Sequence, residues 1–96
     1  MKKMKLKIIK YFWAVGRRTK RVGANRIPVS EGASLNINGV LFKIEKIEAD
    51  AVAVSVIRRD GKTIKEMTVE KGKRAYYRPM SMDGGYEYIL KLTRFF

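Results

Sequence analysis

Apolar side chains occupy every second position near both ends of the chain. Residues 3–8 read Lys-Met-Lys-Leu-Lys-Ile, and residues 86–93 place Tyr or Leu at each even position. A period of two is typical of a strand with one face in the core and the other in water. We therefore expect a strand in each segment. Residues 9–15 lose the strict alternation but keep β-favouring Tyr, Phe, Trp and Val, which extends the first strand; a basic amphipathic helix is the alternative there.

Two dipeptides predict hairpin turns in the middle of the chain. Asn-Gly at 38–39 and Asp-Gly at 60–61 suit two-residue turns, because both central residues tolerate left-handed backbone angles. The first turn sets Ile37 opposite Val40 and Leu35 opposite Phe42. The second sets Val54 opposite Met67 and Val52 opposite Val69. Each register pairs apolar with apolar side chains, so the two hairpins support each other.

The remaining pattern completes an all-β prediction. Residues 51–57 carry no charge, which favours a central strand, since an uncharged edge strand would aggregate. We expect a turn at 70–73, a short strand through 76–77, and a loop over 79–85. Together these predict an all-β fold, a small antiparallel β-sandwich or partly open barrel of six to seven strands. Residues 1–96 would form a single β domain, with a basic N-terminal strand and arm in 1–30 and a hairpin-rich core in 31–96.

Positive charge is concentrated in the first third of the chain. Ten Lys or Arg residues precede the first acid, Glu31, whereas residues 31–96 carry twelve basic and nine acidic residues. The net charge is +13 on 96 residues. Such an excess favours binding to nucleic acid, to an acidic protein surface or to anionic lipid.

Residues 16–23 are the leading candidate for the contact with an anion. Glycines flank this stretch and it holds little to bury, so we expect an exposed arm whose cations follow a phosphate backbone. The residues expected to contact nucleic acid are Arg17, Arg18, Lys20, Arg21 and Arg26, with Tyr77 and Arg78 as an aromatic and basic pair. Of the adjacent Tyr76 and Tyr77, one should face inward and one outward, and Trp13 is a further stacking candidate.

The composition argues against catalysis and metal binding. The chain has no His and no Cys, which removes the commonest general base, the thiolate nucleophile and the usual zinc ligands. Gly-Lys-Thr at 61–63 resembles the end of a phosphate-binding loop, but Val56 stands where that loop needs Gly. We therefore expect no enzymatic activity, no cofactor and no metal. Lys10 interrupts the only apolar run of the N-terminal segment, so we expect a cytoplasmic protein without membrane association.

Two functions from different classes follow from these observations. The first is a non-enzymatic nucleic-acid (polyanion) binding module, largely sequence-independent, in which a β scaffold positions the basic arm of residues 17–26 and the lysine-rich face of the first strand against phosphates. The alternative is a protein-interaction or assembly module, of the kind found as phage or mobile-element accessory proteins, that docks on an acidic protein partner. In that case strand 51–57 or the Phe-Phe pair at 95–96 would supply the apolar contact.

Overall fold

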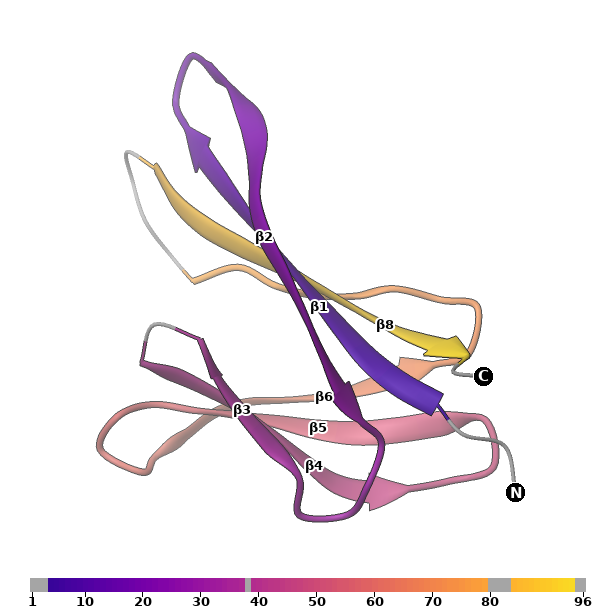
Figure 1. Ribbon diagram of the computed structural model, residues 1–96. Coiled ribbons are helices and arrows are strands. Elements are labelled where there is room, and N and C mark those ends of the chain that lie inside the picture. The colour runs from indigo at the N-terminus through magenta and orange to yellow at the C-terminus, as the bar shows by residue number, and fades with distance from the viewer. Residues whose placement is uncertain (1–3, 38, 80–83, 95–96) are drawn as a thin grey trace.

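Eight antiparallel strands make up the part of the chain that the structure describes. A computed structural model describes residues 4–37, 39–79 and 84–94 (Figure 1). The strands are β1 (Met4–Ala14), β2 (Arg17–Pro28), β3 (Ser34–Ile37), β4 (Val40–Ile47), β5 (Ala51–Ile57), β6 (Thr63–Glu70), β7 (Ala75–Tyr77) and β8 (Gly84–Arg94). The all-β prediction is confirmed. The strand count is eight rather than six or seven, because the segment expected to form an arm is a strand.

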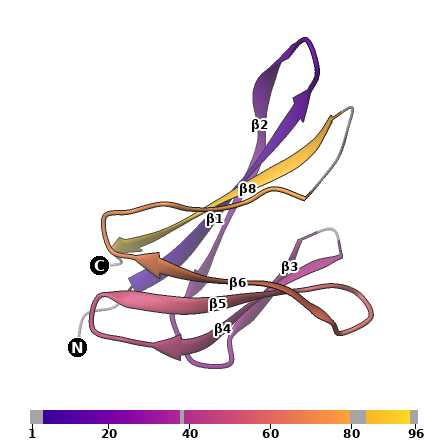
Figure 2. The ribbon, with the colours of Figure 1, turned by 180° about the vertical axis from the view of Figure 1, so that it is seen from behind.

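The strands form two four-stranded sheets that face each other across one core. Sheet A has the order β2-β1-β8-β7, and sheet B has the order β3-β4-β5-β6. Figures 1 and 2 show sheet A lying across sheet B, so that the strands of the two sheets cross. Side chains from both sheets build the buried cluster: Leu6, Ile8, Ile27, Ile37, Phe42, Ile44, Val52, Val54, Val56, Val69, Tyr77, Tyr88 and Leu90.

The N-terminal strand is confirmed, and the helical alternative is wrong. β1 pairs with β8 along its whole length, from Met4 opposite Arg94 to Ala14 opposite Gly84. Residues of even number in β1 face sheet B, as Leu6 and Ile8 in the core show. Because side chains alternate along a strand, residues of odd number point away from sheet B. We call the side of sheet A that faces away from sheet B its outer face.

Residues 19–22 are exposed, as predicted, but residues 17–23 belong to a paired strand and do not form a loop or arm. Gly16 makes the turn at a φ of 77°, a left-handed conformation that glycine adopts without strain. The chain then returns along β1 as β2, with one additional residue, Val22, between the pairs Lys10–Gly23 and Tyr11–Arg21. A bulge of this kind is a common device on an edge strand, and it keeps the pairing without requiring an apolar face.

Sheet B follows the hairpin predictions closely. Ile37 lies opposite Val40 and Leu35 opposite Phe42, as the first turn predicts. Val54 lies opposite Met67 and Val52 opposite Val69, as the second predicts. β5 is central, between β4 and β6. The second turn is longer than predicted, since residues 58–62 connect the two strands. Within it, the Asp60 carboxylate accepts hydrogen bonds from the Arg58 guanidinium at 2.9 Å and from the Lys62 amide at 3.0 Å.

Sheet A extends beyond sheet B at the β1–β2 turn (Figures 1 and 2). None of the described strands forms a second layer beneath this overhang. Its large apolar side chains are exposed: Phe12, Val15, Val22 and Tyr86. Lys10 lies at the base of the overhang with its ammonium 3.8 Å from the centroid of the Tyr86 ring. The expected loop over 79–85 ends earlier than predicted, because Gly84 and Gly85 already belong to β8.

Candidate functional site

Three cations stand side by side across three strands on the outer face of sheet A. Lys7 in β1 is directly opposite Arg26 in β2 and directly opposite Lys91 in β8. Like charges placed opposite each other on a sheet are destabilising. Of the residues that the four described strands place on this face, Glu87 alone is acidic. This row of three residues, Arg26, Lys7 and Lys91, is called the cationic row.

The cationic row changes the titration of its central member. Loss of hydration lowers the pKa of the Lys7 ammonium below its ordinary value of 10.5, and the positive charges of Arg26, Lys91 and Arg21 lower it further. Arg26 and Lys91 stand directly opposite Lys7 on the neighbouring strands, so their charges act on it through space. The free protein keeps three cations together in this row without an acid, and Arg21 in another row adds a fourth positive charge nearby, so an anion at this position would relieve their repulsion.

An uncharged row lies beside the cationic row. Tyr76 in β7 is opposite Ile89 in β8, which is opposite Ile9 in β1, and Ile9 is opposite Ala24 in β2. Tyr76 is 51% exposed at the edge of the sheet, whereas Ile9 in the middle is 7% exposed. We call these four residues the apolar row. It crosses all four strands of sheet A.

A third row on the far side of the apolar row mixes aromatic and charged groups. Arg21, Tyr11 and Glu87 lie opposite one another on β2, β1 and β8. Arg78, the residue after β7, reaches across β8: its Nε is 3.9 Å from a Glu87 carboxylate oxygen, and its guanidinium lies 4.0 Å from the centroid of the Trp13 ring. The path is open because Gly85, opposite Trp13, has no side chain.

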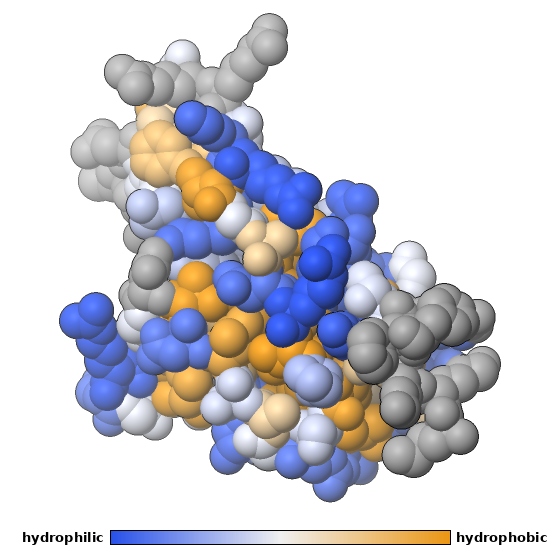
Figure 3. All heavy atoms as spheres, in the orientation of Figure 1, coloured by the Kyte–Doolittle hydropathy of each residue, from blue (hydrophilic) through white to orange (hydrophobic). Residues whose placement is uncertain are grey.

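The outer face therefore alternates charge and apolar surface at short intervals. Successive rows are two residues apart along the strands, about 7 Å, and four strands span about 14 Å. In Figure 3 hydrophilic side chains follow β2 diagonally through the view, with hydrophobic surface exposed on either side of them. This combination of cations and aromatic or aliphatic surface is the composition that nucleic-acid-binding sheets use.

The residues predicted to contact nucleic acid divide among several places. Arg21, Arg26 and Arg78 lie on the outer face. Lys20 is opposite Phe12, so it belongs to the other face, at the overhang. Arg17 begins β2 opposite Ala14. The side chains of Arg17 and Arg18 lie outside the described part of the structure.

Tyr77, predicted from the sequence to contact nucleic acid, is buried in the core instead. Tyr77 is 8% exposed and its ring stacks on Tyr88 at 5.9 Å between centroids. Burial raises the pKa of both phenols. Since neighbours on a strand face opposite ways, Tyr76 is the exposed member of the pair. Trp13 is on the outer face, with its ring under Arg78; its indole Nε1 is buried without a hydrogen-bond partner in the described structure.

The sequence suggested the lysine-rich face of the first strand as a phosphate contact, but it did not show that Lys7, Lys91 and Tyr76 lie on one surface. The lysines of residues 3–7 looked like the wet face of a strand, and Lys91 looked like the polar side of the last strand. Only the pairing of β1 with β8 brings Lys7 and Lys91 together. The sequence did offer one signal: in both strands the apolar residues alternate on one face, and lysine lies on the other face.

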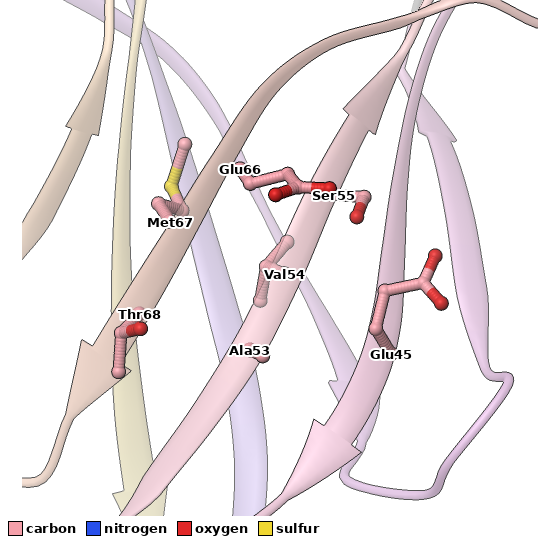
Figure 4. A pocket seen from close by; sticks show the side chains of 7 residues that line it. All are labelled: Glu45, Ala53, Val54, Ser55, Glu66, Met67 and Thr68. Carbon is pink, nitrogen blue, oxygen red and sulfur yellow. The ribbon is translucent and has the colours of Figure 1, made fainter.

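A shallow hollow of about 370 Å³ lies on sheet B. Small side chains on β5, Ala53 and Ser55, leave this space between β4 and β6, and Figure 4 shows Glu66 extending toward Ser55, with Glu45 on the opposite side. Two carboxylates make the hollow unsuitable for a phosphate. β5 is paired along both edges, so strand 51–57 can meet a partner only through the outward-facing side chains that line this hollow, such as Ala53. The Phe-Phe pair at 95–96 lies outside the described residues.

Within residues 4–37, 39–79 and 84–94, no three His, Cys, Asp or Glu side chains cluster in a way that could hold a metal ion. Over the same ranges, no helix has the length and apolar character needed to cross a membrane. Neither protein-family models nor curated proteins nor solved structures give a match to this chain.

Proposed function

We propose that this protein is a non-enzymatic nucleic-acid-binding module whose contact surface is the outer face of sheet A. The observation that carries the proposal is the cationic row, in which Arg26, Lys7 and Lys91 stand in direct opposition without an acid between them. An array of phosphates supplies several negative charges at once and offsets this repulsion. The contact surface is thus a folded sheet face rather than the flexible arm that the sequence suggests.

Binding should be largely independent of sequence. Lysine and arginine contacts to phosphates position a nucleic acid but do not read its bases. The absence of His and Cys from the chain supports a role without catalysis. A nucleic-acid partner is consistent with a cytoplasmic location, which remains part of the proposal.

Salt dependence of the affinity tests the proposal. Four phosphate contacts, at Lys7, Arg21, Arg26 and Lys91, predict a slope of log K against log salt of about −2.8 for a single strand to about −3.6 for a duplex. The affinity should then fall about 50- to 150-fold between 50 and 200 mM salt. Absence of binding at 20 mM salt to both single-stranded and duplex oligonucleotides, or a flat salt response, would overturn the proposal.

A matched pair of double variants tests whether nucleic acid contacts the outer face of sheet A. Arg26→Gln with Lys91→Gln removes two charges from the cationic row and should reduce the salt slope by about 1.5. Lys46→Gln with Lys62→Gln removes two charges from exposed positions of sheet B and its connecting loop, and should leave the slope within about 0.5 of the wild-type value. Equal losses in both double variants would mean that net charge, not this surface, governs binding.

One observation favours the second candidate function, docking on an acidic protein. The overhang exposes Val15 at 71%, Tyr86 at 42% and Phe12 at 36%, and clustered exposed apolar side chains are typical of protein interfaces. Under this function Phe12→Ser would abolish binding to the partner, and recovery of the partner would survive nuclease treatment. Under the nucleic-acid function, Phe12→Ser leaves oligonucleotide affinity unchanged.

A further inference from the structure

We infer that the outer face of sheet A binds single-stranded nucleic acid in preference to duplex, with a base stacked on Tyr76. The inference rests on the proposed function and deepens it. Tyr76 is half exposed at the β7 edge of the apolar row, beside the cationic row on one side and Arg78 on the other. An aromatic ring in this setting offers a surface for a base while the cations hold the neighbouring phosphates.

Tyr76 is held in place by its neighbours. Tyr77 anchors β7 through stacking on Tyr88. On the other edge of β7, the Lys65 ammonium donates a hydrogen bond to the Tyr76 carbonyl oxygen at 3.1 Å. The ring therefore projects from a fixed backbone, and a base that stacks on it loses less freedom than it would against a mobile loop.

The apolar row continues the surface that Tyr76 begins. Next to Tyr76, the partly exposed Ile89 extends this surface without a charge; Ile9 further along the row is buried, and Ala24 at the far edge is partly exposed. The apolar row carries no charge, so it neither attracts nor repels phosphates. Binding of a polyanion through its phosphates alone would therefore make no use of this row. Bases do use such a surface, because every base has an apolar face that can leave water.

A duplex cannot exploit this arrangement. Its bases are stacked on one another inside the helix, and only phosphates and groove edges reach a flat sheet face. A single strand can turn its bases toward Tyr76 and leave its phosphates at the cationic row. The same chemistry is present in single-stranded DNA and RNA, so the two are compared as separate ligands in the test.

Fluorescence anisotropy with a labelled dT12 oligonucleotide, an rU12 oligonucleotide, a 12-base-pair duplex and heparin tests the inference. Heparin is a polyanion without bases. At equal salt, dT12 or rU12 should bind more tightly than the duplex, and Tyr76→Ala should weaken that binding by roughly 5- to 100-fold. Heparin affinity should change by less than about 2-fold, because Tyr76 contributes no charge.

Two control variants separate stacking from other effects. Tyr76→Phe keeps the ring and should retain binding within about 3-fold. Tyr86→Ala removes an exposed tyrosine from the opposite face of sheet A and should leave dT12 affinity unchanged. Circular dichroism of each variant confirms that it is folded.

Failure of the inference differs from failure of the proposed function. If dT12 and duplex bind the wild type but Tyr76→Ala has no effect, or if duplex binds more tightly, the inference is overturned and the proposed function stands. If no oligonucleotide binds at 20 mM salt, the proposed function fails as well. Equal losses of heparin and dT12 binding in Tyr76→Ala would also overturn the inference, since stacking cannot explain them.

Discussion

Replacing Tyr77 by alanine should unfold the protein far more readily than the same change one residue earlier. Tyr77 is 8% exposed, whereas Tyr76 is 51% exposed. The Tyr77 ring stacks on Tyr88 and meets the edge of Phe42 from sheet B at 6.3 Å between centroids. It therefore joins the two sheets, while Tyr76 points away from both.

The structure sets the size of the difference. Truncating a buried aromatic side chain costs about 3–5 kcal/mol, and the two ring contacts place Tyr77 within that range, at about 4 kcal/mol. An exposed substitution away from special features changes stability by about 0.5 kcal/mol. At ~0.05–0.15 kcal/mol per residue, a domain of this size has about 5–14 kcal/mol in total. Tyr77→Ala should thus remove a large fraction of the stability.

Urea unfolding followed by far-ultraviolet circular dichroism measures the free energy for each variant. Tyr77→Ala should lower the unfolding midpoint strongly with little change in the slope m, and Tyr76→Ala should overlay the wild type. Tyr77→Phe, which keeps the ring contacts, should cost about 1 kcal/mol or less. A Tyr77→Ala cost below about 1 kcal/mol, or equal costs at the two positions, would refute the packing argument.

Four further predictions follow from particular contacts. The Lys7 pKa, followed by NMR of its side chain, should lie below 10.5 in the free protein and rise when dT12 binds; a pKa that stays fixed on binding would place the phosphate elsewhere. A double-mutant cycle of Lys10→Met and Tyr86→Leu should give a coupling of about 0.5–2 kcal/mol, and no coupling would contradict the cation–π contact. Gly84→Ala should lower the melting temperature, because its new methyl carbon would lie 2.6 Å from a β1 carbonyl oxygen at a backbone φ of 150°; an unchanged melting temperature would show that the strands separate at no cost. Hydrogen bonds lower the pKa of Asp60 below 3.8, so its contribution to stability is present above pH 3.8 and is lost as pH falls through the lower folded-state pKa. Wild type and Asp60→Asn should therefore converge in urea midpoint at low pH, and a difference that persists there would exclude this linkage.

Sheet B was predictable because its information is local. Each hairpin is specified by a turn dipeptide and by apolar partners within a few residues of it, as Leu35 and Phe42 illustrate. The uncharged residues 51–57 likewise require a central position for a reason that does not depend on the rest of the fold. Local signals of this kind can be tested against each other within one stretch of sequence.

Sheet A was only partly predictable because its pairing is long-range. The alternating pattern predicts a strand in the β1 segment and another in the β8 segment, but no local signal indicates that the two strands pair. β2 is the opposite case: residues such as Gly23 and Arg21 suggest an exposed loop, and pairing with β1 overrides that preference. The outer face of sheet A depends on the pairing of β1 with β8 and with β2. Its positive charge could be predicted from the sequence, but the arrangement of its side chains could not.

The adjacency of β1 and β8 makes the proposed binding surface a late product of folding. Sheet B can form from residues 34–70 through neighbouring hairpins. β1 and β8, by contrast, join residues about 70 to 90 positions apart, and such contacts require costly loop closure before they stabilise anything. The cationic row therefore exists only in a chain that has completed the β2-β1-β8 pairing of sheet A. A nucleic acid at 100 times its dissociation constant would stabilise that state by about 2.7 kcal/mol, so ligand binding would select fully folded molecules over those with sheet B alone.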